Sequence, residues 1–243
     1  MTESPDRDRV ERALVVTAHP DDVDFGAAGT VAAWTAAGVA VSYCLVTSGD
    51  AGGFDDTPRE EMAGLREAEQ TAAAAEVGVD DLTFLHYRDG SVAATTELRR
   101  DIARVIRRVR PQRVLTQSPE WFWERIGASH PDHRATGEAA LAAVYPDARN
   151  PFAHPELLDE EGLEPWTVPR TWLMACPPER VNRVVDVGPT LGAKLAALRA
   201  HRSQVAHRDD LEEIVRRSLS ANAERFAQND ERLVEVFQVV ETG

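Results

Sequence analysis

The ten residues ALVVTAHPDD, at positions 13–22, indicate the fold class of this chain. The apolar run at the start of this stretch is rich in β-branched residues, which is typical of a buried strand in a parallel sheet. Pro20 has no backbone N–H to donate to a strand ladder, so the strand ends before it. Residues 23–30, VDFGAAGT, then open an alanine-rich helix. One imidazole and two carboxylates therefore lie at the carboxyl end of a first strand, where open α/β sheets bind ligands.

An Asp-rich turn before a helix also has a purely structural explanation, because Asp22 or Asp24 is a good helix N-cap. A second segment, SHPDH at residues 129–133, favours a functional explanation. It also follows an expected strand, residues 113–117, and strands of one parallel sheet bring such segments to the same edge. Imidazole and carboxylate are good ligands for a divalent ion such as zinc. The pair of segments therefore predicts one shared metal site.

Composition limits the kinds of protein that this chain can be. Its 243 residues are 43% hydrophobic, which fits one α/β domain over residues 1–243. Residues 1–12 are expected to be a flexible lead-in, and they lack an apolar signal core. Its 27 basic and 41 acidic residues give a net charge of -14, which argues against nucleic acid or an anionic membrane as a partner. No apolar run approaches the length of a membrane span. Cys44 and Cys176 lie in apolar runs without a CxxC pair, as expected of reduced thiols in a cytoplasmic protein.

Strands and helices alternate along the chain. Strands are expected at residues 13–17, 39–47, 82–87, 113–117, 171–175, 183–187 and 233–240. Helices are expected at residues 26–37, 58–77, 97–109, 132–144, 191–200 and 211–227. This alternation predicts an α/β, Rossmann-like, mostly parallel sheet with helices on both faces. Residues 145–169 break the rhythm and are expected to form a long loop over the site or at an interface.

The two His-Pro-Asp segments also carry a family resemblance. The pattern His-Pro-Asp-Asp-x-acid-x-Gly-x-x-Gly-Thr begins at His19, and His-Pro-Asp-His begins at His130. Together they resemble the zinc-dependent deacetylases of the LmbE/PIG-L family. Shorter matching pieces are TSGD at 47–50, REAE at 66–69, DG at 89–90, Lys194 with HRSQ at 201–204, and AERF at 223–226. Asp24 departs from the pattern, since the family commonly carries Glu there, and many members have an acid where this chain has Val23.

The resemblance implies an LmbE-like fold and a zinc site whose ligands are His19, Asp22 and His133. Two histidines and one carboxylate also resemble the facial triad of non-haem iron enzymes, so Fe²⁺ is an alternative occupant. Asp21 is the expected general base, because it neighbours a ligand and is free to take a proton from the attacking water. A carboxylate there can instead orient a ligand, and the two roles are compatible.

Three further residues receive roles that each have a structural alternative. His130 is expected to stabilise the oxyanion as an imidazolium, and Asp132 to hold that imidazole. The alternative for this segment is a helix start, with Asp132 as a cap. Arg66 binds substrate, as the resemblance implies, or forms a solvated salt bridge with Glu69.

Other side chains have weaker patterns. Asp89 binds a sugar hydroxyl or forms a turn. His201 precedes a helix end and is expected to be structural. The aromatic residues WFW at 121–123 stack on a sugar, line an interface or pack into the core; if they are exposed, a contact surface is favoured.

The resemblance implies a zinc-dependent hydrolase that removes an N-acetyl group, or a related N-acyl group, from an N-acetylglucosamine-like small molecule. An amidase of a mycothiol-type thiol conjugate is the alternative. A nucleotide-binding Rossmann module is a remote one, because the first loop lacks GxGxxG and carries three carboxylates that repel a pyrophosphate. A homo-oligomer is expected from the aromatic segment, from residues 145–169 and from the family.

Overall fold

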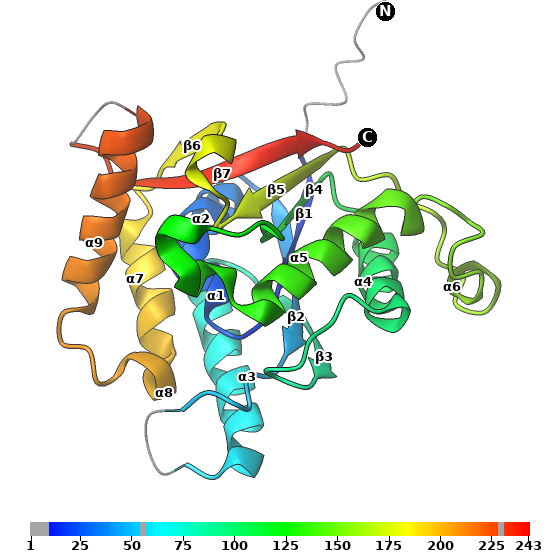
Figure 1. Ribbon diagram of the computed structural model, residues 1–243, viewed down its shortest axis with the longest axis horizontal. Coiled ribbons are helices and arrows are strands. Elements are labelled where there is room, and N and C mark those ends of the chain that lie inside the picture. Colours follow the sequence, from blue (N-terminus) through cyan, green and yellow to red (C-terminus); the bar gives the residue numbers. More distant parts are fainter. Residues whose placement is uncertain (1–9, 54–56, 228–230) are drawn as a thin grey trace, which may run out of the picture.

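Within residues 10–53, 57–227 and 231–243, which this computed structural model describes, seven strands form one sheet in the order β3-β2-β1-β4-β5-β7-β6 (Figure 1). The strands are β1 (Arg12–Thr17), β2 (Ala40–Thr47), β3 (Asp81–Tyr87), β4 (Arg113–Gln117), β5 (Arg170–Met174), β6 (Arg183–Asp186) and β7 (Val234–Glu241). The first five pair in parallel. The last strand, β7, pairs antiparallel with both β5 and β6. The predicted mostly parallel α/β sheet is confirmed.

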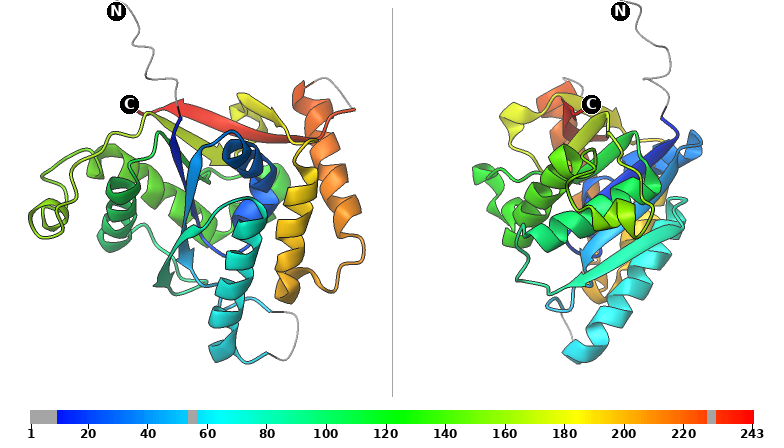
Figure 2. Two further views of the ribbon diagram at one scale, coloured as in Figure 1. Left: turned by 180° about the vertical axis from the view of Figure 1, so that it is seen from behind. Right: turned by 90° about the vertical axis from the view of Figure 1, so that its right-hand side faces the viewer.

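Helices cover both faces of this sheet. The longer ones are α2 (Ala28–Ala36), α3 (Arg59–Glu76), α4 (Thr96–Val109), α5 (Pro131–Ala142), α7 (Leu191–Ala200) and α9 (Leu211–Asn222). In Figures 1 and 2, α3, α7 and α9 stand on one side of the strands and α4 on the other. Successive side chains of a strand point to opposite faces of the sheet, and in β1 both faces are apolar. Ala13 and Val15 pack in the core cluster under α2 and α3. Leu14 and Val16 pack in the cluster under α4 and α5.

The strand order explains why the two His-Pro-Asp segments meet. From β1 the chain first adds β2 and β3 on one side and then returns to place β4 on the other side, so the sheet reverses its winding between β1 and β4. Such a reversal leaves a crevice at the carboxyl ends of the two strands. Gly137 of α5 lets the helix approach closely there, since a Cβ at this position would lie 2.2 Å from the backbone oxygen of Gln117.

Several elements differ from the sequence prediction. The helix expected at residues 26–37 is α2, which begins only at Ala28 because the backbone of Ala27 is not helical, and the sequence did not indicate the short helix α1 (Asp22–Gly26) before it. The helix expected at 211–227 ends as α9 and continues as a π-helical turn, η5 (Ala223–Ala227). The sequence did not indicate the short elements η2 (Trp123–Ser129), η3 (Ala143–Asp147), α6 (Glu156–Asp159), η4 (Pro178–Arg180) and α8 (Arg202–Val205). Residues 1–9 of the expected lead-in lie outside the described residues, and Arg12 already belongs to β1.

Residues 145–169, for which the sequence predicted a long loop over the site or at an interface, pack against α4 in the structure. The guanidinium of Arg107, buried on α4, donates hydrogen bonds to the carbonyls of Asp147, Ala148, Asn150 and Ala153. At the end of the segment, Trp166 donates its indole N–H to the carbonyl of Pro111, just before β4 begins. These contacts place the segment near the amino ends of the strands (Figure 1). Of the described helices, none has the length and hydropathy to cross a membrane.

Candidate active site

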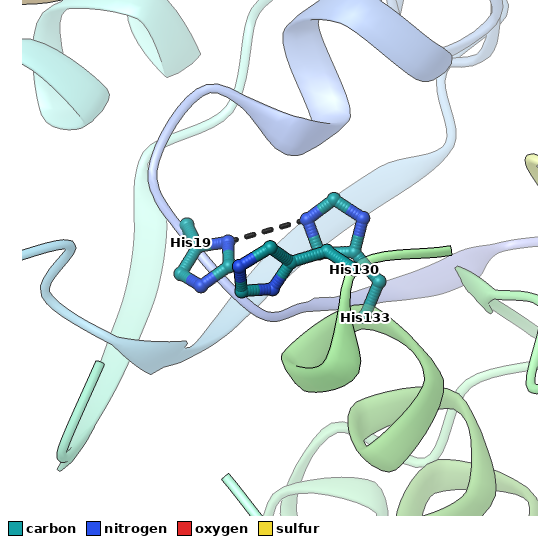
Figure 3. A group of neighbouring side chains, drawn as sticks. All are labelled: His19, His130 and His133. Carbon is teal, nitrogen blue, oxygen red and sulfur yellow. Dashed lines mark hydrogen bonds between the residues drawn. The ribbon is translucent and has the colours of Figure 1, made fainter. Parts of the chain in front are cut away.

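Three side chains from the two loops converge at the switch between β1 and β4. His19 follows β1, while His133 lies in the first turn of α5, so residues far apart in sequence face each other (Figure 3). His133 Nε2 lies 2.9 Å from Asp22 Oδ1 and 3.3 Å from His19 Nδ1. His19 Nδ1 lies 3.4 Å from Asp22 Oδ2. Two imidazole nitrogens and one carboxylate therefore point at a single small volume.

Carboxylates hold the far nitrogen of His19. Its Nε2 lies 3.2 Å from Asp132 Oδ2 and 3.2 Å from Asp89 Oδ1. Asp132 is fully buried and also accepts the backbone N–H groups of Gly90 and Val92. Carboxylates in this position orient a metal-binding imidazole and raise its basicity. The expectation that Asp132 holds His130 was wrong, because its carboxylate reaches back under the loop to His19.

Asp22 is fixed from three sides. Its Oδ2 accepts the backbone N–H of His19 at 2.7 Å and the side-chain amide of Gln117 at 2.9 Å. The same Gln117 accepts the backbone N–H of Ala18 through its Oε1. Sequence reasoning missed Gln117, which ends β4 and whose only signal was its place at the carboxyl end of a buried strand.

The electrostatics of the cluster favour a bound cation. Burial opposes charge on His19, but the carboxylates of Asp22, Asp132 and Asp89 raise its pKa to about 12. Burial likewise opposes ionisation of Asp22, yet His133 and His19 lower its pKa well below the usual range. The pKa of His133 is raised because Asp22 outweighs burial. The cluster is thus stabilised by positive charge, and replacing protons with a divalent ion keeps that balance.

Two other combinations of ligating atoms exist near His19. Ring nitrogens of His19, His130 and His133 lie within 4.8 Å of one another, as do donor atoms of His19, Asp89 and Asp132. The second combination uses carboxylates that already accept backbone N–H groups. His19, Asp22 and His133 form a third combination, in which Asp22 Oδ1 lies 2.9 Å from His133 Nε2 and Asp22 Oδ2 lies 3.4 Å from His19 Nδ1. Two histidines and one carboxylate are a donor set that a catalytic zinc accepts in proteins.

Asp21 stands beside this cluster without contributing to it. Its backbone is left-handed, with φ 84°, and its N–H donates to Gln70 Oε1 at 2.8 Å. Burial and the neighbouring charge of Asp22 raise the pKa of Asp21 to about 6, although Arg66 opposes the shift. A carboxylate that titrates near neutrality is well matched to taking up and returning a proton.

Arg66 is buried and contacts Asp21 rather than solvent. It donates to Asp21 Oδ2 at 3.1 Å and to the carbonyls of Pro20 and Gly49. The salt bridge to Glu69 that the helix spacing allowed is absent among the described ion pairs, since Glu69 instead accepts the N–H and hydroxyl of Ser203. Arg66 therefore positions Asp21.

His130 is the N-cap of α5. Its Nδ1 accepts the backbone N–H of Asp132 at 3.2 Å, which leaves the ring proton on Nε2. Burial and the positive charges of His19 and His133 lower the pKa of His130. The structure thus favours a neutral imidazole with one N–H donor here, and the expected imidazolium is not supported.

A second buried network lies close to Asp21. His201 Nε2 lies 2.8 Å from Asp24 Oδ2, which also accepts the side-chain amide of Gln70. His201 and Asp24 are both fully buried, so the expected structural role of His201 fits. Beside them, Lys194 Nζ pairs with Glu235 Oε1 at 2.9 Å. The network joins α1, α3, α7 and β7 and thereby fixes the loop that carries Asp21.

Two adjacent cavities flank Asp21 and Asp22. The base-side cavity, of about 390 Å³, reaches Asp21 and has Phe25, Arg125 and Leu219 in its wall. The histidine-side cavity, of about 430 Å³, reaches Asp22 and His133 and shares the same three wall residues. Volumes of this size accommodate small organic ligands.

The chain is similar in sequence and fold to several known proteins. Residues 14–144 match the sequence model of a family described as PIG-L: GlcNAc-PI de-N-acetylase. The chain is 32% identical to a diacetylchitobiose deacetylase of Thermococcus kodakarensis, over 80% of this chain and 70% of that protein. It is 30% identical to a 1D-myo-inositol 2-acetamido-2-deoxy-alpha-D-glucopyranoside deacetylase of Rhodococcus erythropolis, over 80% of this chain and 81% of that protein. The fold resembles the solved N,N'-diacetylchitobiose deacetylase of Pyrococcus horikoshii, with a TM-score of 0.86 and 29% identity over 99% of this chain and 87% of that one.

Proposed function

This chain belongs to the PIG-L family, and from that premise we propose that it is an N-deacetylase of a small molecule containing N-acetylglucosamine. It hydrolyses the acetamide and releases acetate and a free amino sugar. The observation that carries the proposal is the convergence of His19, Asp22 and His133 beside the buried carboxylate of Asp21.

We propose that the three converging side chains hold a zinc ion, with Fe²⁺ as the alternative occupant. Two neutral imidazoles and one carboxylate suit either metal, and the remaining nitrogen of His19 is already oriented by Asp89 and Asp132. A divalent ion held by these residues would supply a Lewis acid for the acetyl carbonyl and would lower the pKa of bound water to near neutrality.

Asp21 carries the proton in this proposal. As a carboxylate it accepts the proton from the water that attacks the carbonyl carbon. The same proton then passes to the nitrogen of the scissile amide as the C–N bond breaks, so acetate and the amine leave with balanced charge. Arg66 donates to Asp21 Oδ2 at 3.1 Å and so holds this carboxylate, which lines the base-side cavity.

His130 donates a hydrogen bond to the oxyanion that develops on the acetyl oxygen. Its Nδ1 is occupied by the backbone N–H of Asp132, so Nε2 is the nitrogen that donates. A preorganised donor of this kind is worth roughly 10²–10³ in rate in acyl-transfer enzymes.

Acetate release separates this function from its alternatives. The purified protein, loaded with zinc, should release acetate from at least one neutral or charged N-acetylglucosaminide. An amidase of a mycothiol-type conjugate would instead cleave the amide of the thiol-bearing acyl group and leave simple acetamides intact. Absence of acetate with every N-acetyl sugar, together with cleavage of such a conjugate, would reject the deacetylase assignment.

We also propose a homo-oligomer in the cytoplasm. The rings of Trp121 and Trp123 stack with centroids 5.0 Å apart and are exposed, by 40% for Trp121 and 76% for Trp123. Exposed aromatic pairs of this kind are typical of contact surfaces. Light scattering at micromolar concentration checks the assembly, and a mass of one chain would contradict it.

A further inference from the structure

The base-side cavity has an apolar wall with positive charge on it. Phe25, Leu211, Ile214 and Val215 supply the apolar surface. Arg125, Lys194 and Arg208 are the cations that line it, and Asp21 is its carboxylate. This local excess of positive charge contrasts with the chain's net charge of -14.

Two of the charges in this cavity are already compensated. Lys194 pairs with Glu235 at 2.9 Å, and Asp21 pairs with Arg66 at 3.1 Å. In contrast, the side chains of Arg125 and Arg208 have no ion pair within the part of the chain that the structure describes. The cavity is thus left with two uncompensated guanidinium groups.

The two arginines of the cavity come from different connections of the chain, and Arg125 lies at a break in a short helix. It lies in η2, where its φ of -142° and ψ of 75° interrupt the 3-10 helix. This extended residue breaks the helical path between β4 and α5, in the same connection that delivers His130. Arg208 also lines the cavity and comes from the link between α8 and α9. The two arginines therefore approach one cavity from different parts of the chain.

We propose that the base-side cavity binds the aglycone of the substrate, and that this aglycone carries an anionic group, a carboxylate or a phosphate, recognised by Arg125 and Arg208. The inference rests on the proposed function for the identity of the sugar. Guanidinium groups bind carboxylates and phosphates in a planar, two-pronged geometry. The apolar wall accommodates the carbon skeleton of the aglycone, while the acetamide lies between Asp21 and His133.

The first experiment compares kcat/KM on zinc-loaded protein for substrates that differ in charge. Diacetylchitobiose is the neutral probe, N-acetylglucosaminyl malate the carboxylate probe, and N-acetylglucosamine 1-phosphate the phosphate probe. A charge-assisted hydrogen bond corresponds to roughly a 10- to 100-fold preference, so at least one anionic probe should exceed the neutral one by tenfold or more. Which anionic probe is preferred identifies the group. Equal kcat/KM for all three probes would overturn the inference and leave the deacetylase assignment standing.

Variants of the two arginines test whether these side chains recognise the anionic group. Arg125→Gln and Arg208→Gln should each lower kcat/KM for the preferred anionic substrate by roughly tenfold more than for the neutral substrate. Arg217→Gln is the matched control, because Arg217 lies on α9, is exposed, and pairs with Glu213 away from the cavity. If both variants weakened neutral and anionic substrates equally, the arginines would not recognise charge.

Binding decides the inference even if no probe is hydrolysed. Calorimetry should show that glucosaminyl malate or glucosamine 1-phosphate binds the intact protein at least tenfold more tightly than chitobiose, with a preference that falls as salt rises. Arg125→Gln should remove that preference and Arg217→Gln should retain it. No acetate release with retained anion binding would reject the proposed function alone, whereas equal binding of all three ligands would reject the inference alone.

Discussion

Replacing the carboxylate of Asp21 by an amide separates catalysis from folding at this site. Asp21→Asn keeps the size of the side chain and an oxygen that can accept from Arg66. An amide cannot take a proton from water or return it to the leaving amine. General base catalysis contributes roughly 10²–10⁴-fold, so kcat should fall by that factor with KM little changed. Metal content should stay at the wild-type value, because the converging atoms belong to His19, Asp22 and His133.

Asp21→Asn should lower kcat but should raise the free energy of unfolding. Burial and Asp22 raise the pKa of Asp21 to about 6, from an ordinary value of 3.8. Between about pH 4 and pH 6 the folded protein therefore binds more protons than the unfolded chain, and stability falls as pH rises through this window. At about 1.36 kcal/mol for each unit of pKa, ionisation of Asp21 costs the metal-free protein at most about 3 kcal/mol at neutral pH. Asp21→Asn removes this cost, so its free energy of unfolding should rise by about 1–3 kcal/mol.

Urea denaturation of the chelator-treated proteins at pH 7.5 measures this change, beside metal content and acetate release. Asp22→Asn is the matched control. The pKa of Asp22 is held well below its usual range by His133 and His19 against the effect of burial, so its charge stabilises the fold above that range. Asp22→Asn should therefore lose both metal and stability. The reasoning would be refuted if Asp21→Asn were less stable than the wild type, since its loss of rate would then have a structural explanation.

Three further variants and the pH profile of the wild-type protein test other parts of the site and its support. His133→Ala should release the metal and abolish activity, which elemental analysis of the purified variant checks, and full occupancy would remove the ligand assignment. Asp132→Asn should weaken metal affinity by roughly 10- to 100-fold in a chelator competition, because it removes the carboxylate that orients His19. In wild-type protein, kcat/KM should fall about tenfold for each pH unit on the acid side of the profile, because Asp21 must be ionised to act as the base. The fall should begin at or below about pH 6, since a bound metal favours the charged form of Asp21. A flat profile down to pH 4 would exclude Asp21 as the base. Gly137→Ala should lower the free energy of unfolding by about 1–3 kcal/mol in urea, because its Cβ would lie 2.2 Å from the backbone oxygen of Gln117.

The sequence by itself determined the fold class and the chemistry of the converging loops. Alternating apolar runs and helical periods are local properties, so they identified each strand of the sheet and most of the helices. His-Pro-Asp segments after two strands predicted that His19 and His133 would meet, because parallel strands of one sheet end at the same edge. Strand type, proline position and ligand chemistry are all encoded within a few residues.

Only the tertiary structure decided which groups orient those side chains. Gln117 and Asp22 are 95 residues apart, and Asp132 and His19 are 113 residues apart. The sequence does not show which side chain the carboxylate of Asp132 contacts, because many residues could be its partner. The direction that it takes depends on how β1, β4 and the start of α5 pack. The same holds for Arg66, whose helical neighbour Glu69 was the local candidate but whose buried guanidinium contacts Asp21 instead. Hydrogen bonds between distant segments form only where the packed core fixes both partners, which is why the sequence supplied the reacting groups and the fold supplied their supports.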